Sequence, residues 1–354
     1  MHLDWLRGVA VVVMITAHAT DAWTRPADRG LALYRWTIVV AGGGSALFLF
    51  LAGVAATLAA SARARRFNDS DRAAASVRRR GWQIFLYAFV FRLQSFALSP
   101  GSSLLGLLKV DILNVMGPSI AAAAGLWQLA RSTRGRVILL SIVTAAIALL
   151  TPVVRTAAWP AFLPPPIEWY LRPSPGRTNF TLLPWAGFVT AGAVVGVWLD
   201  GARGPRAERR AHLVLAAVAF GLVVVGWAGS YMPSPYRQSA FWTSSPAFFC
   251  LRTGVLTATV AGAYTWSRAH GTALTRGPLC RLGLSSLFVY WIHVEMVYGR
   301  LSTPLHGSLP LPLTYTAIAI FTGLMLVAVI VKDRAVRWWR GQPPASLDEI
   351  GHHA

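Results

Sequence analysis

The sequence predicts an all-α protein: a polytopic integral membrane helical bundle of about ten transmembrane helices, with the N and C termini in the cytoplasm. Three observations predict this class. Hydrophobic residues make up 55% of the 354 residues and charged residues only 13%, whereas a soluble domain carries about 25% charged residues. The apolar residues gather in long runs, and the basic residues gather in the short gaps between the runs.

Each apolar run is long enough to cross a hydrocarbon core, which requires about 18 to 25 residues. The gaps contain Pro, Gly and Arg, as connecting loops do. We expect a single transmembrane domain over residues 1–331 and a cytoplasmic tail over 332–354, with a disordered end from Gln342 to Ala354. The runs are 3–22, 36–60, 81–98, 110–130, 137–154, 181–199, 213–230, 247–266, 282–299 and 313–331.

The charge distribution orients these runs. The chain has 33 Lys and Arg against 13 Asp and Glu, a net charge of +20. Because the basic residues lie between apolar runs, they indicate an anionic lipid surface as partner and not a nucleic acid. Of the 33 basic residues, 21 lie in one set of alternate gaps and the C-terminal tail, and eight lie in the opposite gaps. By the positive-inside rule, this distribution places both termini on the cytoplasmic side of an inner (plasma) membrane. The alternative for the first run is a signal peptide cleaved after Ala17-His18-Ala19, which Asp4 disfavours.

Ionisable side chains inside spans are costly, so each one is a candidate functional residue. The topology places a set of them in one layer, in the outer half of the bilayer. Two alternatives are a buried ion-pair network that fastens the helices and a transporter or flippase that uses the layer as a path. A helix break at Gly42–Gly44 would suit transport, but no inverted repeat is visible. The layer comprises His18, Asp21, Arg92, Gln94, Asp111, Asn114, Arg252, His293 and Glu295.

The opening LDWLRGVAVVVMITAHATDAW has an Arg-Gly pair, Arg7-Gly8, and a histidine, His18, eleven residues after the arginine. This spacing resembles the acyltransferase type 3 superfamily. LDWLRG together with HATD is most similar to bacterial relatives of heparan-alpha-glucosaminide N-acetyltransferase. The stretches FLFLAGV (48–54), VDILNVMG (110–117), LLPWAGFVTAGAVVG (182–196) and LGLSSLFVYWIHVEMVYG (282–299) follow in the order of that branch.

The resemblance implies a membrane-bound acyltransferase that moves an acyl group, usually acetyl, from cytoplasmic acyl-CoA to an acceptor on the outer side. Acetyl-CoA is then the co-substrate, and the partner is a glycan or glycolipid acceptor. A homodimer is an open alternative for the assembly of the protein. The matched positions are Arg7, His18, Asp21 and His293. Lysosomal members have Asn at the position of His18 and an active histidine in the following loop, whereas no histidine lies between His18 and His212 here. The family's basic segment before LDWLRG is missing, so the natural start is expected upstream.

Acyl transfer from a thioester needs a base for the acceptor's proton and a group that stabilises the oxyanion. His18 is the expected base because an imidazole changes charge near neutral pH. Asp21 lies one turn further on the same helix face and is expected to orient it. His293 and Glu295 form either a second acid/base pair or partners for the arginines.

The remaining candidates are binding groups. Arg92 or Arg252 is expected to receive the developing negative charge, and Arg7, Asp111 and Asn114 complete the predicted substrate- and cofactor-binding set. The arginines of residues 63–80 face the cytoplasm, where anchoring to lipid is favoured over binding the phosphates of CoA. No Cys or His spacing typical of a metal site occurs, and no metal is expected. A third reading, besides enzyme and transporter, is a structural partner of an envelope-glycan assembly complex.

Overall fold

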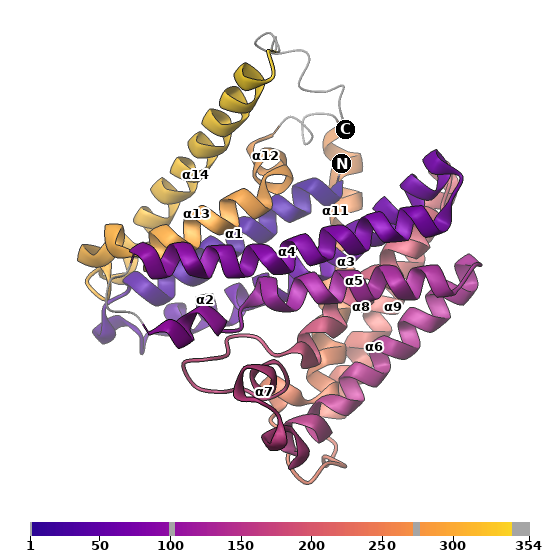
Figure 1. Cartoon of the computed structure of the whole chain (residues 1–354), viewed down its shortest axis with the longest axis horizontal. Helices are drawn as coiled ribbons and strands as arrows, with labels where there is room; N and C mark the ends of the chain where they lie inside the picture. Colours follow the sequence, from indigo (N-terminus) through magenta and orange to yellow (C-terminus); the bar gives the residue numbers. More distant parts are fainter. Residues whose placement is uncertain (1, 99–102, 272–276, 342–354) are drawn as a thin grey trace. The chain divides into compact units, whose positions relative to one another are not determined.

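The computed structural model describes residues 2–98, 103–271 and 277–341, and every regular element in these ranges is a helix (Figure 1). In these ranges, extended backbone pairs only in two isolated β-bridges, Thr24 with Leu309 and Val110 with Thr178. The predicted all-α class is therefore confirmed. Arg276, one of the basic residues used to orient the chain, and the expected disordered end lie outside the described residues.

The chain divides into two compact units, residues 1–48 with 262–354 and residues 49–261. Both boundaries fall inside helices, in α3 (Gly43–Phe67) and in α11 (Pro246–His270). The first unit, called unit 1 below, contains most of the two ends of the chain, and unit 2 contains the middle. The single domain expected over residues 1–331 stays a prediction.

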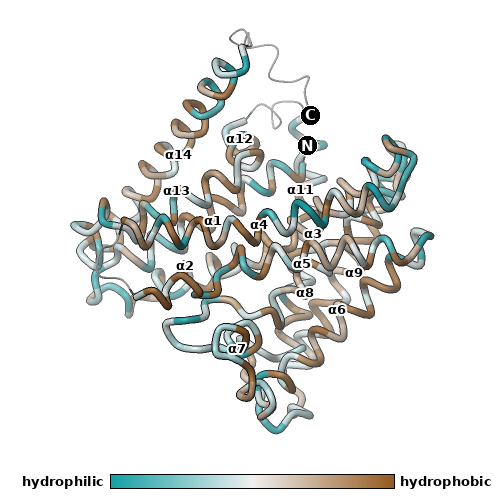
Figure 2. Tube along the Cα trace, in the orientation of Figure 1, coloured by the Kyte–Doolittle hydropathy of each residue, from teal (hydrophilic) through white to brown (hydrophobic). Residues whose placement is uncertain are grey.

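Eight helical segments of the described residues are long and apolar enough to cross a membrane. Figure 2 shows apolar residues along most of α6, α9 and α14, and hydrophilic residues at the turn that follows α3. The chain is a helical membrane protein, while the side on which its termini lie stays a prediction. The segments are α1 (His2–Trp23), α2 (Ala32–Ala41) together with α3, α5 (Ile112–Leu129), α6 (Thr133–Thr156), α8 (Leu182–Asp200), α9 (Pro205–Ser230), α11 and α14 (Leu311–Trp339).

The other two predicted runs also coincide with helices. Run 81–98 is the second half of α4 (Ser70–Leu98), whose Gln83, Arg92 and Gln94 lower its hydropathy. Run 282–299 is divided at Ser285 between α12 (Pro278–Leu284) and α13 (Ser286–Tyr298). The helix break considered at Gly42–Gly44 is present within the predicted run 36–60, because α2 ends at Ala41 and α3 begins at Gly43.

In unit 1, α1 packs against α2, α12, α13 and α14. Two glycines allow the backbones of α1 and α12 to touch: a Cβ on Gly8 would collide with the carbonyl of Leu279, and a Cβ on Gly283 would collide with that of Asp4. Small residues at such crossings are the usual means of close packing between membrane helices. This contact fixes α12, and with it the start of α13, against the cytoplasmic half predicted for α1.

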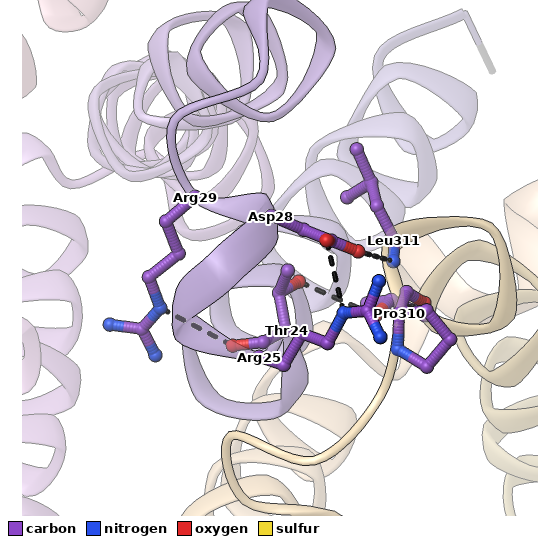
Figure 3. Close-up of polar contacts among 7 residues, drawn as sticks. Thr24, Arg25, Asp28, Arg29, Pro310 and Leu311 are labelled. Carbon is purple, nitrogen blue, oxygen red and sulfur yellow. Dashed lines mark hydrogen bonds and ion pairs between the residues drawn. The ribbon is translucent and has the colours of Figure 1, made fainter.

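A polar clasp joins the end of α1 to the start of α14 (Figure 3). The buried Asp28, in the short helix η1 (Pro26–Asp28), accepts hydrogen bonds from the backbone N–H of Leu311 (2.8 Å) and from Nε of Arg25 (3.0 Å). The backbone N–H of Arg25 donates to the carbonyl of Leu309 (2.9 Å). Because Leu311 begins α14, Asp28 satisfies one of the N–H groups that the first helical turn leaves unpaired.

In unit 2, α4 packs along α5, and α8 packs on α5 and α6. Glycines again permit the closest contact: a Cβ on Gly53 of α3 would collide with the carbonyl of Val189, and one on Gly192 of α8 would collide with that of Phe50. Shorter elements complete the unit: η2 (Leu104–Leu108), η3 (Trp159–Phe162), α7 (Pro165–Leu171) and α10 (Phe241–Ser244). Asp69 accepts hydrogen bonds from the backbone N–H groups of Asp71 and Arg72 at the start of α4.

Candidate functional site

Two histidines, one from each of the two sequence segments that make up unit 1, form a hydrogen-bonded pair. Nδ1 of His18 on α1 lies 3.0 Å from Nε2 of His293 on α13. The two rings are nearly parallel, with an interplanar angle of 11° and centroids 5.2 Å apart. His293 is fully buried, with 0% of its surface exposed, and His18 is partly buried. Both residues were predicted from sequence as site residues, and the structure brings them into direct contact.

The hydrogen bonds assign roles to the ring nitrogens of the pair. Nδ1 of His293 lies 2.8 Å from the carbonyl oxygen of Val289. Because a carbonyl only accepts, Nδ1 of His293 carries the hydrogen, and in the neutral ring Nε2 is the acceptor. Nδ1 of His18 is then the donor to His293, and the lone pair of neutral His18 is on Nε2. A fixed imidazole with one nitrogen held and the other carrying a lone pair is the arrangement that a general base requires.

Aromatic rings surround the histidine pair. Tyr290 meets His293 edge-on at a centroid distance of 5.8 Å, and the Tyr298 ring lies 5.6 Å from that of His18. The hydroxyl of Tyr298 donates to the carboxylate of Asp21 at 3.4 Å. The exposed Asp21 is therefore linked to a ring that packs on His18, and its direct orienting role stays a prediction. The other predicted acid, Glu295, lies on α13 two residues beyond His293 and is partly buried.

Arg7 lies near the other end of α1, beside the interruption of the 282–299 run. Its Nη2 donates to the hydroxyl of Ser286 at 2.9 Å. Lys332 of α14 donates to the hydroxyl of Ser285 at 2.6 Å. Two cations from different helices therefore hold the break between α12 and α13. The contact of Arg7 with a substrate or cofactor stays a prediction.

In unit 2, the structure gives Arg92, Asp111 and Asn114 well-defined partners. Nη2 of Arg92 lies 2.5 Å from Oδ2 of Asp111. Asp111 caps α5: its side chain accepts from the N–H of Ile112, and Oδ1 of Asn114 accepts from the N–H of Asp111. Asn114 also donates to the hydroxyl of Tyr170 on α7 at 3.3 Å. This ion pair and capping box match the structural alternative weighed from sequence, and a binding role for the three residues stays a prediction.

Two titratable groups border this ion pair. Burial lowers the pKa of Lys109, and the positive charge of Arg92 lowers it further, while Asp111 acts in the opposite direction. Burial also raises the pKa of Tyr170, partly offset by its hydrogen bond with Asn114. Both shifts favour the neutral forms of the two side chains.

Arg252 lies in a third polar group: it lines a cavity of unit 2 together with Arg155. The sequence predicted one polar layer, and the structure resolves three groups: the histidine pair with Asp21 in unit 1, the Arg92 ion pair in unit 2, and this cavity in unit 2. Tyr298 and Arg155 were missed as site residues. Arg155 had a sequence signal, because it is a lone basic residue at the outer end of a predicted span.

These features define a class: a helical membrane protein with a buried, hydrogen-bonded histidine pair suited to acid–base chemistry. The sequence model of the family described as "Heparan-alpha-glucosaminide N-acetyltransferase, catalytic" matches residues 1–226. The chain belongs to this family. No curated protein matches the chain.

The family membership has direct consequences for the predictions. The resemblance to heparan-alpha-glucosaminide N-acetyltransferases is confirmed, whereas the wider acyltransferase type 3 assignment stays a prediction. The chain is thus a member of a family of membrane acetyltransferases, whose name describes a glycan as the substrate and whose acetyl donor is acetyl-CoA. The matched range contains His18 and Arg92 but ends before Arg252, His293 and Glu295. In the described part of the chain, no three His, Cys, Asp or Glu side chains form a group that could hold a metal ion.

Proposed function

We propose that the protein transfers an acetyl group from cytoplasmic acetyl-CoA to a hydroxyl or amine of a glycan or glycolipid acceptor on the outer side of the inner (plasma) membrane. Family membership supports the acetyl group and the glycan class. The charge distribution of the gaps supports the direction. The observation that carries the proposal is the His18–His293 hydrogen bond, with His293 anchored on the carbonyl of Val289.

In the proposed reaction, the acceptor's oxygen or nitrogen attacks the thioester carbonyl carbon of acetyl-CoA. The acceptor's proton passes to Nε2 of His18 as the new bond forms. The carbon–sulfur bond then breaks, and the CoA thiolate leaves. His18 releases the proton it accepted, which balances the protonation of the thiolate to the CoA thiol and restores the neutral base. Arg7 is proposed to contact the donor from the end of α1 predicted to be cytoplasmic.

His293 is proposed as the positioning residue, the role that the sequence had suggested for Asp21. When His18 gains a proton on Nε2, its Nδ1–H still donates to Nε2 of His293. The ring therefore keeps its orientation in both protonation states. The anchor of His293 on its own helix makes this orientation independent of the substrate, as preorganised sites require.

The first prediction concerns His18. The change His18→Ala removes the base, so acetyl transfer is expected to fall by about 100-fold to 10,000-fold, the usual contribution of such a base. The measurement is release of CoA and acetylation of an acceptor by purified protein in lipid nanodiscs. His270→Ala is the control, because His270 is an exposed histidine whose ring bonds the carbonyl of Trp266 on its own helix, away from the histidine pair. The His18→Ala variant should accumulate normally in the membrane and retain binding of acetyl-CoA.

Near-normal transfer by His18→Ala would make His293 the next candidate base. His293→Gln separates a positioning role from a purely structural one, because it should shift the pH profile of the rate without abolishing folding. If both variants fail to accumulate in the membrane, the histidine pair is structural. Uptake of a substrate into proteoliposomes without release of CoA would instead support the transporter.

A further inference from the structure

The cavity beside Arg155 and Arg252 is of ligand size and lies within unit 2. Its volume is 370 Å³, within the range of about 300–1,000 Å³ typical of small-molecule sites. It is bordered by the end of α6, the segment before α8, the first turns of α8, α10, and the first turns of α11. In the predicted topology all of these lie toward the outer side.

The charges of this cavity are unbalanced. Its lining contains two guanidinium groups and no carboxylate. Nη2 of Arg155 donates to the hydroxyl of Thr181 (2.9 Å) and to the carbonyl of Leu183 (3.2 Å), both uncharged, and its buried Nε has no hydrogen-bond partner. Arg252 lies over the rings of Phe248 and Trp185, at 4.5 and 6.0 Å from their centroids. No ion pair joins either arginine to a carboxylate in the described part of the chain.

This differs from the way the same unit handles another half-buried arginine. Arg92 has a carboxylate at 2.5 Å, because removing a guanidinium from water without a counter-charge is unfavourable. Arg155 and Arg252 line the same cavity and have only uncharged partners. A fastening network would place an acid between them, whereas an anion-binding site leaves that place to the ligand.

Aromatic side chains form a large part of the remaining lining, beside prolines and small polar residues. The rings of Phe188 and Phe249 stack at a centroid distance of 4.8 Å. Gly187 makes this possible, because a Cβ at that position would collide with the ring of Phe249. Trp242 packs edge-on against Phe248 at 5.0 Å. A cavity lined by aromatic rings, small polar side chains and two arginines suits a ligand that has a charged group and a less polar body.

From these two arginines without a carboxylate partner and the aromatic rings beside them, we infer that the cavity binds the phosphate group of an organic phosphate on the outer side, carried by the acceptor or by its lipid anchor. A phosphate monoester has a charge of about −1.5 to −2 at pH 7, which balances two guanidinium groups better than a carboxylate does. Its oxygens can accept from two arginines on different helices at once. The assignment of this phosphate to the acetyl acceptor or its lipid anchor rests on the proposed function. The inference that the cavity binds a phosphate group does not depend on that function.

The test uses the full chain in nanodiscs of phosphatidylcholine, with glucose 1-phosphate, glucose and CoA as soluble probes. Glucose 1-phosphate should raise the Tm and glucose should not. Arg252→Gln and Arg155→Gln should each weaken binding about tenfold or more, because a hydrogen bond to a charged group is lost. The matched control is Arg237→Gln, which removes the same charge from an exposed position of unit 2 outside the cavity. If Arg252→Gln fails to fold, Arg252→Lys, which keeps the charge but loses the planar fork, should still weaken binding measurably.

A second arm identifies the source of the phosphate. A minor fraction of phosphatidic acid in the nanodiscs should stabilise the protein through the same arginines if the ligand is a lipid headgroup, and glucose 1-phosphate alone should do so if it is a phosphorylated sugar. Equal stabilisation by glucose, equal loss in Arg237→Gln, or arginine-dependent binding of CoA alone would overturn the inference. His18→Ala should bind glucose 1-phosphate normally, so loss of acetyl transfer and loss of phosphate binding are separate results.

Discussion

At the scale of single residues, Asp28 shows how one carboxylate holds two distant segments of unit 1. The hydrogen bond from the backbone N–H of Leu311 lowers the pKa of Asp28, burial opposes this, and Arg25 lowers it further. The group therefore favours its charged form in the folded protein. It connects the turn after α1 to the first residue of α14 (Figure 3).

The second prediction follows from that pKa. A carboxyl group with a lowered pKa stabilises the folded state above its unfolded-state pKa, and this stabilisation is lost as the pH falls through the folded-state pKa. Thermal unfolding of the protein in detergent should therefore show a Tm that declines on acidification, and Asp28→Asn should lower the Tm at neutral pH and flatten this decline. Asp333→Asn, which changes a more exposed carboxylate of α14, should keep the wild-type pH dependence. If both variants follow the wild-type curve, the clasp does not contribute to stability.

The sequence could identify the residues of the histidine pair but not the pairing itself. His18 and His293 stood out because they are the histidines inside predicted spans, where an ionisable group is costly. Their contact depends on α1 lying along α13, over 275 positions of separation. The unpaired state of Arg155 and Arg252 was also beyond sequence reasoning, because it depends on which carboxylates the folded chain places nearby.

At the scale of the helices, the stretches that carry the family resemblance contain glycines at the closest helix crossings. Gly8 of LDWLRG faces α12, and Gly283 of the last stretch faces α1. Gly53 of FLFLAGV and Gly192 of the α8 stretch let α3 and α8 touch. The resemblance therefore reports helix packing as much as chemistry, since small residues let two helix backbones approach each other.

The third prediction tests this packing. In Gly8→Ala the new methyl group meets the backbone of Leu279, so the free energy of unfolding should fall by about 1–3 kcal/mol, the usual cost of overpacking. Gly323→Ala is the control within unit 1: Gly323 lies inside α14 with no atom near its Cβ position. That change should be neutral or stabilising by about 0.5–1 kcal/mol, because glycine weakens a helix interior. Equal stability of the two variants in a detergent unfolding assay would contradict the role given to Gly8.

The lengths of the apolar runs predicted where the spanning helices lie. They did not predict a helix break that depends on hydrogen bonds from residues far away in the sequence. The interruption at Gly42 was one option from the sequence, because a glycine run permits it. The interruption at Ser285 was not expected, because it depends on hydrogen bonds from Arg7 and Lys332, which approach from α1 and α14. The helix also continues beyond the expected boundary at Val331 to Trp339, since its arginines can reach the lipid surface while the backbone stays helical.

At the scale of the whole molecule, direction is the property on which the proposed reaction depends. Arg7 bonds Ser286, His18 bonds His293, and Trp23 donates to the carbonyl of Val297, so α1 and α13 run parallel. The predicted topology requires this, because both runs were assigned the same outward direction. Along α1, His18 lies about 16 Å beyond Arg7, so the same helix can present one residue to a cytoplasmic donor and the other to an outer acceptor.

The last prediction tests the sidedness that this mechanism needs. A reporter fused after Arg66 or after Arg210 should be cytoplasmic, because the arginine-rich segments around residues 63–80 and 203–210 resist transfer across the membrane. A reporter fused after Trp169 should be external, because the gap that contains α7 carries few basic residues. The three fusions should be read with paired reporters, one active only inside and one only outside, so that each site gives a positive signal. Reversal at any one site would contradict the ten-span order and place His18 near the wrong face, whereas agreement at all three would leave the outer half of the membrane as the place where the acceptor meets the histidine pair.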